Sequence, residues 1–181
     1  MIGRIVSALA LGAALALVGC GAGATNANAP SSGKDSASSG DAVDFTLTDI
    51  EGREMKLSSY MAKGPVLMSF WATWCKPCLA EMDHLQSLYE TRKDKGFTLL
   101  AISLDGPESE ASVAPFVHSK GWTFPVAVDT ETRVTSLYNP RRAQPFTILI
   151  DRHGKIVFKH ENFNPGDEKE LEAQVDKTLA P

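Results

Sequence analysis

Residues 66–78, VLMSFWATWCKPC, decide how this 181-residue chain folds. Five of the six residues at 66–71 are apolar, a run that is too short for a helix and is typical of a buried β-strand. Cys75 and Cys78 follow at once, and from Leu79 to Tyr89 apolar residues recur at steps of three and four, as on one face of a helix. The stretch therefore predicts a strand that leads into a helix, with two cysteines at the junction.

This junction gives the two cysteines different chemistry. Cys75 would lie exposed at the amino end of the helix, where unpaired amides and the helix dipole stabilise a thiolate. Cys78 would lie one turn further on, facing inward and within reach of Cys75. Pro77 suits the first turn, where its missing N–H costs nothing. The pattern predicts thiol–disulfide exchange in which Cys75 attacks and Cys78 resolves. A zinc site is not favoured, because no second CxxC or His pair completes one.

The motifs resemble those of the membrane-anchored TlpA/ResA-type thioredoxins, in the redoxin or AhpC/TSA-like branch of the thioredoxin superfamily. The resemblance spans residues 42–181 and rests on residues 70–72, 74–78, 81 and 144–146. It implies an α/β thioredoxin fold with a mixed central sheet, helices on both faces, an N-terminal β-hairpin over residues 42–57 and a βα insertion. It implies no cofactor and no resident metal. A peroxiredoxin is not favoured, since Met68 and Ala72 stand where those enzymes need Pro and Thr.

The remaining elements follow from apolar patterning and turn residues. The helix after the cysteines is expected to end at Gly96. Strands are expected at residues 97–104, 126–128, 145–150 and 155–159, and helices at residues 108–120, 129–138 and 167–179.

The resemblance also suggests a proton carrier for the second cysteine. Many thioredoxins have a buried Asp in the strand before the cysteines, but this chain has Ser69 there, which cannot carry a proton at neutral pH. Glu81, one helical turn beyond Cys78, would replace it if burial raised its pKa. The alternative is an exposed Glu81 on the helix surface with no part in the reaction.

Gln144 and Pro145 form the second part of the expected site. From base rates alone, a trans proline at the start of an edge strand would be expected. The resemblance implies instead a cis Pro145 beside the cysteines, where the preceding backbone binds an incoming peptide. Trp74, Lys76 and Pro77 are expected to complete the substrate-binding surface.

Residues 1–20 predict an export signal. Arg4 precedes an apolar stretch at residues 5–18, and Leu17-Val18-Gly19-Cys20 resembles a bacterial lipobox, whose cysteine is lipidated. A transmembrane anchor is the alternative, but the apolar stretch is shorter than the ~20 residues that a spanning helix needs. Lipidation of Cys20 would leave Cys75 and Cys78 as the remaining pair among the three cysteines. We expect an extracytoplasmic lipoprotein of the cell envelope.

Composition divides the rest of the chain. Residues 21–41 are rich in Gly, Ala and Ser and predict a flexible linker, whereas residues 42–181 are long enough for one thioredoxin-like domain. The net charge of −4, without a basic cluster, argues against nucleic-acid binding. A monomer is expected.

Three functions fit these features. The first is an exported oxidoreductase that reduces disulfides in other exported proteins, such as apocytochrome c in cytochrome c maturation, with electrons from a membrane thiol–disulfide donor. The second is a copper or zinc carrier that uses the thiolate pair. The third is a recognition module whose disulfide switches a binding surface.

Overall fold

The computed structural model describes residues 40–180, which contain a five-stranded mixed sheet. Its strand order is β5-β4-β3-β6-β7, with bounds β3 (Val66–Trp71), β4 (Thr98–Ser103), β5 (Val126–Val128), β6 (Phe146–Ile150) and β7 (Ile156–Glu161). β3, β4 and β5 are parallel, while β6 is antiparallel to both β3 and β7. Every residue of β3 and β4 is buried, as expected for central strands covered on both faces. The predicted mixed sheet is confirmed.

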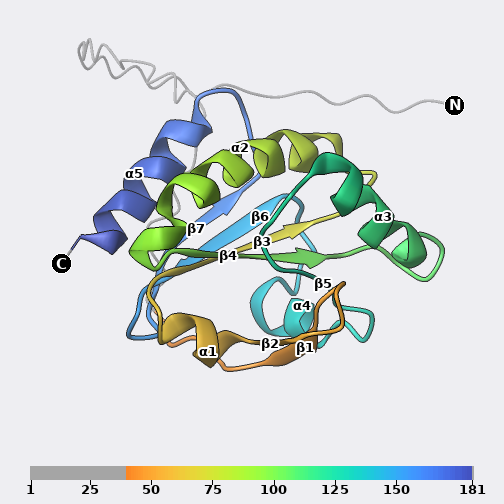
Figure 1. The fold of residues 1–181 in the computed structure, drawn as a ribbon, viewed down its shortest axis with the longest axis horizontal. Coiled ribbons are helices and arrows are strands. Elements are labelled where there is room, and N and C mark those ends of the chain that lie inside the picture. Colours follow the sequence, from red (N-terminus) through yellow and green to blue (C-terminus); the bar gives the residue numbers. More distant parts are fainter. Residues whose placement is uncertain (1–39, 181) are drawn as a thin grey trace, which may run out of the picture. The chain divides into compact units, whose positions relative to one another are not determined.

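Helices cover both faces of this sheet, as predicted (Figure 1). The first face carries α2 (Lys76–Arg92), α3 (Glu110–Lys120) and α5 (Asp167–Leu179). The second face carries α1 (Leu57–Met61), α4 (Arg133–Tyr138) and the hairpin of β1 (Thr46–Thr48) and β2 (Glu54–Lys56). Each face holds its own hydrophobic cluster, and the one beneath α2 includes both cysteines.

Several elements differ from the predicted bounds; α4, for example, begins at Arg133 rather than at residue 129, and two further differences have a clear physical cause. α2 ends at Arg92 rather than at Gly96, because residues 93–95 tighten into one 3₁₀ turn before Gly96 takes a φ of 91°. Leu57 begins α1 instead of continuing the hairpin strand. The reason is a capping contact, in which Asp44 Oδ1 accepts a hydrogen bond from the Ser58 N–H at 2.9 Å and satisfies a free amide of the first turn.

Backbone contacts cover both edges of the sheet. At the β5 edge, the hairpin turn forms a bridge between Asp49 and Ala127. At the β7 edge, Asp41 bridges to Lys155, the Ala42 N–H donates to the Gly154 carbonyl at 2.7 Å, and the Ile156 N–H donates to the Gly40 carbonyl at 3.0 Å. The chain therefore joins the domain beside the turn between β6 and β7.

The predicted export signal, Cys20 and the predicted linker up to residue 39 lie outside the described residues. None of the helices within residues 40–180 has both the length and the hydrophobicity that crossing a bilayer requires.

Candidate active site

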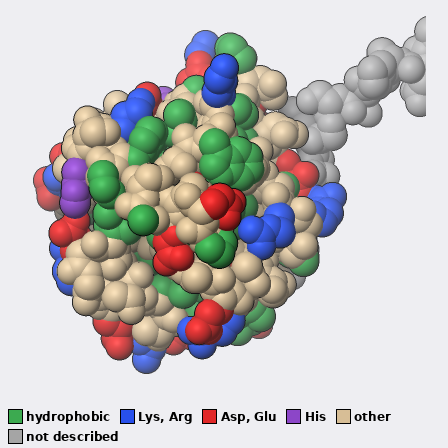
Figure 2. Space-filling view, turned by 90° about the vertical axis from the view of Figure 1, so that its right-hand side faces the viewer, with side chains coloured by type: hydrophobic (Ala, Val, Ile, Leu, Met, Phe, Trp, Pro, Cys, Tyr) green, Lys and Arg blue, Asp and Glu red, His purple; other side chains and the backbone are tan. Residues whose placement is uncertain are grey.

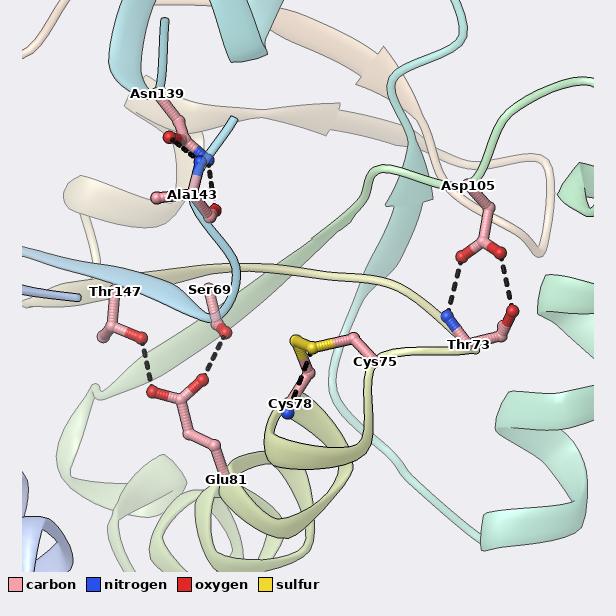
Figure 3. Close-up of a disulfide and its surroundings, with 9 residues drawn as sticks. All are labelled: Ser69, Thr73, Cys75, Cys78, Glu81, Asp105, Asn139, Ala143 and Thr147. Carbon is pink, nitrogen blue, oxygen red and sulfur yellow. Dashed lines mark hydrogen bonds between the residues drawn. A yellow bond between two sulfur atoms is a disulfide. The ribbon is translucent and has the colours of Figure 1, made fainter. Parts of the chain in front are cut away.

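The two cysteines form a disulfide at the start of α2 (Figure 3). Cys75 is the last residue before the helix, and its sulfur accepts a hydrogen bond from the Cys78 backbone N–H at 3.3 Å. Pro77 lies in the first turn. Because the free amides of a first helical turn carry partial positive charge, this placement stabilises negative charge on the Cys75 sulfur. The predicted junction of strand, cysteine pair and helix is confirmed.

Cys75 is less exposed than the sequence predicts. It exposes 6% of its surface, and Cys78 exposes none. The reason is that Cys75, bonded to Cys78, belongs to the hydrophobic cluster beneath α2. Of the two sulfur-bearing residues, Cys75 is still the one that reaches the surface, so a substrate can meet it first.

Glu81 is completely buried on α2. Its Oε2 accepts a hydrogen bond from Ser69 Oγ at 3.0 Å, and its Oε1 accepts one from Thr147 Oγ1 at 2.7 Å (Figure 3). Burial raises the pKa of Glu81 from 4.5 to about 7; the two hydroxyl donors oppose this rise, and the negative charge of Asp167 adds to it. The alternative of an exposed Glu81 on the helix surface is therefore wrong. A carboxyl group with this pKa can take up and release a proton near neutral pH.

Thr147 is a contributor that the sequence analysis missed. It lies on β6 directly opposite Ser69 on β3, and both side chains are buried. The two hydroxyls therefore reach the Glu81 carboxylate from neighbouring strands. Ser69 was expected only as a residue that cannot carry a proton, and the structure gives it the further role of hydrogen-bond donor.

The peptide bond between Gln144 and Pro145 is cis, as the resemblance implied. Pro145 precedes Phe146, which pairs with Phe70 near the end of β3, so it lies at the same end of the sheet as the cysteines. Asn139 holds the loop before it: its Nδ2 donates to the Ala143 carbonyl at 2.7 Å, and the Ala143 N–H donates to its Oδ1 at 2.9 Å.

The expected substrate-binding residues differ in exposure. Trp74 exposes 60% of its surface, Lys76 and Pro77 are also exposed, Gln144 is half-buried and Pro145 is buried. Figure 2 looks at the end of the domain toward which β3 and β4 point, and hydrophobic side chains lie near the centre of this face among acidic and basic ones. This end therefore offers apolar surface to a segment of another protein.

A second buried acid contacts the loop that carries the cysteines. Asp105 follows β4 and accepts hydrogen bonds from the backbone N–H and the hydroxyl of Thr73 (Figure 3). The sequence analysis did not single it out, because neither residue belongs to the cysteine motif.

Within residues 40–180, no group of three or more His, Cys, Asp or Glu side chains is arranged to hold a metal ion.

Comparison with known proteins places the chain among thiol–disulfide proteins. Thiol-disulfide oxidoreductase ResA of Geobacillus kaustophilus is 42% identical over 115 residues, and the chain spans 64% of that relative's length, less than two thirds. Thiol-disulfide oxidoreductase ResA of Bacillus subtilis is 38% identical over 139 residues, which cover 76% of this chain and 75% of that protein.

A solved structure and a family match agree with these relatives. A crystal structure described as a thiol:disulfide interchange protein DsbE from Chlorobium tepidum superposes with a TM-score of 0.71 at 32% identity, covering 78% of this chain and 97% of that one. Residues 39–159 match the AhpC/TSA family. With its thioredoxin-like fold and its cysteine pair at the start of α2, the chain belongs to the AhpC/TSA family of thioredoxin-like proteins.

Proposed function

We propose that the protein is an exported, lipid-anchored thiol–disulfide oxidoreductase that reduces disulfides in other exported proteins. The observation that supports this most is the Cys75–Cys78 disulfide at the start of α2, with the buried Glu81 one turn further along the helix. The relatives named thiol-disulfide oxidoreductase ResA support the same activity.

In the proposed reaction, the reduced protein acts through both sulfurs. The Cys75 thiolate attacks one sulfur of a client disulfide, forms a mixed disulfide and releases the other client sulfur as a thiolate. Glu81, as carboxylate, takes the proton from the Cys78 thiol, and the Cys78 thiolate attacks the Cys75 sulfur. This step forms the Cys75–Cys78 disulfide and releases the second client thiolate, so two electrons pass to the client.

The client would lie across the end of the domain shown in Figure 2. Trp74, Lys76 and Pro77 offer exposed surface beside Cys75, and the backbone at Gln144, before the cis Pro145, would pair with an extended client segment. Apocytochrome c is the proposed client in cytochrome c maturation. A membrane thiol–disulfide protein would return electrons to the Cys75–Cys78 disulfide, and the lipid on Cys20 would keep the two proteins on one membrane.

Turnover of a disulfide-bonded protein substrate tests the activity. The reduced protein should reduce the substrate repeatedly when a dithiol reductant is supplied, and a Cys75→Ser variant should not. The same assay is repeated with one equivalent of Cu(I) or Zn²⁺. A protein that holds the metal tightly and turns over no disulfide would contradict the oxidoreductase and favour the metal carrier.

The clients can be identified by trapping. Because Cys78 resolves the mixed disulfide, a Cys78→Ser variant should accumulate covalent complexes with its natural clients in the cell envelope. Mass spectrometry of these complexes, with Cys75→Ser as the control, should recover exported proteins that carry cysteine pairs. Equal recovery with both variants would mean that the complexes do not form through Cys75.

A further inference from the structure

The side-chain carboxylate of Asp105 accepts three hydrogen bonds at the carboxyl end of β4. The residue is 4% exposed. Its Oδ1 accepts from Thr73 Oγ1 at 2.6 Å, and its Oδ2 accepts from the Thr73 N–H at 2.9 Å and from Ser103 Oγ at 2.7 Å (Figure 3). Two of the three donors thus belong to Thr73, in the loop between β3 and α2.

These bonds extend the contact between β3 and β4 beyond their last paired residues. The parallel pairing ends with Trp71 opposite Ser103, and the Leu104 N–H donates to the Trp71 carbonyl at 2.7 Å. Beyond this point, the backbone N–H and the hydroxyl of Thr73 both bind Asp105. Trp74 and Cys75 follow Thr73 directly, so this carboxylate binds the residue from which the cysteine loop continues.

We propose that Asp105 is a positioning residue for thiol–disulfide exchange, which through Thr73 holds the loop that presents Trp74 and Cys75 to a disulfide substrate. The proposal rests on the proposed function. The two bonds from Thr73 fix both the backbone and the side chain of that residue to one carboxyl group. Since attack on a disulfide needs close alignment of the sulfur atoms, a displaced loop slows the reaction.

A second buried acid provides a matched control. Asp129 follows β5, is 5% exposed, and its Oδ2 accepts from the N–H and the hydroxyl of Thr135 at 2.7 and 2.6 Å. The same pairing of Asp with Thr thus recurs at the same end of the sheet, but there it holds α4 rather than the cysteine loop. Variants of Asp129 therefore report the effect of losing such a pair away from the cysteines.

The test compares Asp105→Ala with Asp129→Ala in the reduced full-length protein in detergent. The second-order rate constant for the first attack on a small aromatic disulfide is measured well below the unfolding temperature of each variant. Asp105→Ala should slow the attack about 10-fold or more, and Asp129→Ala should stay within about twofold of wild type. Amide hydrogen exchange at Thr73 should accelerate only in Asp105→Ala, and exchange at Thr135 only in Asp129→Ala.

Asp105→Asn separates geometry from charge. Its amide oxygen can accept from the Thr73 N–H and Ser103 Oγ, while its NH₂ donates to Thr73 Oγ1, which rotates to accept. The attack should therefore remain within about threefold of wild type. If Asp105→Ala fails to fold, Thr73→Val takes its place with Thr135→Val as its control, and only Thr73→Val should slow the attack.

Three results would overturn the positioning role. These are a folded Asp105→Ala that attacks at the wild-type rate, equal slowing by Asp105→Ala and Asp129→Ala, or an Asp105→Asn as slow as Asp105→Ala. Failure of the proposed function gives a different result: wild-type protein would then reduce no protein disulfide. Attack on the small disulfide and exchange at Thr73 would still decide whether Asp105 positions the loop.

Discussion

Glu81 is a carboxyl group whose surroundings disfavour its charge without removing its hydrogen bonds. Ser69 and Thr147 are both neutral donors, so they bind the carboxylate without adding positive charge. The result is a pKa of about 7, which is nearer to the ordinary thiol pKa of about 8.5 than the ordinary Glu value of 4.5 is. Glu81 is therefore a stronger base toward a thiol than an ordinary glutamate, and it can still lose its proton again near neutral pH.

Replacement of Glu81 should separate the two chemical steps. In Glu81→Gln, attack by Cys75 should be nearly unchanged, because the start of α2 stabilises that thiolate. Resolution by Cys78 should slow by about 10²-fold, since the variant lacks the base, and mixed disulfides should accumulate. Quenched-flow trapping with separation of the mixed disulfide measures both steps.

Glu170→Gln on α5 is the matched control, because Glu170 is exposed. It should resolve mixed disulfides at the wild-type rate. If Glu81→Gln does so as well from pH 5 to pH 9, Glu81 is not the base.

The same buried carboxyl group should make stability depend on pH. Its pKa is about 7 in the folded protein against 4.5 ordinarily, so between these values the unfolded chain ionises while the folded one keeps its proton. The contribution of the protonated Glu81 to the free energy of unfolding is therefore fully present below pH 4.5 and is lost as pH rises to 7. At ~1.4 kcal/mol for each pH unit, the loss is about 3 kcal/mol.

Urea denaturation of wild type and Glu81→Gln at pH 4.5 and pH 8 measures this difference. The side chain at position 81 in Glu81→Gln is neutral at both pH values. The free energy of unfolding of this variant should therefore lack the decrease with pH that Glu81 causes in the wild type. Parallel curves for the two proteins would mean that the folded pKa of Glu81 is not raised.

Sequence distance explains which site residues could be predicted. Cys75, Cys78 and Glu81 lie in one strand–helix segment, where spacing alone places them on the same turns. Thr147 is 66 residues from Glu81, and Asp105 is 32 residues from Thr73. These partners meet only when β6 and β4 pair with β3, and Thr and Asp are common enough in loops and strands that nothing in the sequence distinguishes them.

At the scale of elements, two glycines allow β3 and β4 to start side by side. Gly64 precedes β3 and Gly96 precedes β4, with φ of 154° and 91°. A Cβ atom on Gly64 would lie 2.5 Å from the Gly96 carbonyl oxygen, and a Cβ on Gly96 would clash with the Lys63 carbonyl oxygen. Glycine is therefore required at both positions for two reasons: the positive φ, and the close approach of the two backbones.

Gly96→Ala should accordingly lower the free energy of unfolding by about 2–4 kcal/mol. Gly121→Ala is the control, since Gly121 also has a positive φ, 67°, but a Cβ there would meet nothing within 4 Å. It should cost only about 1 kcal/mol, the ordinary penalty of the left-handed conformation. Thermal and urea denaturation measure both, and equal losses would show that the Lys63 contact relaxes freely.

Elements with a clear apolar pattern could be predicted from the sequence, whereas a helix of only five residues could not. β5 and α5 have the predicted bounds, Val126–Val128 and Asp167–Leu179. α1 was missed because its five residues are too few to show a helical period. Its start depends on Asp44, 14 residues before the Ser58 N–H that it binds.

At the scale of the whole molecule, we expect the three cysteines to divide between chemistry and anchoring. We expect the mature protein to carry acyl chains on Cys20 and to partition into detergent. Cys20→Ala should abolish both properties while leaving reduction of a small disulfide unchanged, because Cys75 and Cys78 remain. Mass spectrometry of the mature amino terminus and phase separation measure this, and a mature terminus mapped elsewhere would contradict lipidation at Cys20.

The backbone contacts of Gly40 and Ala42 place the start of the domain at the end of the sheet opposite the disulfide. They bind the turn between β6 and β7, and β6 runs antiparallel to β3, so this turn lies beside Val66 while the cysteines follow Trp71 at the far end. A six-residue strand is about 20 Å long. The chain thus enters the domain about one strand length away from Cys75, and residues 40–42 leave the end of the domain that carries the cysteines uncovered.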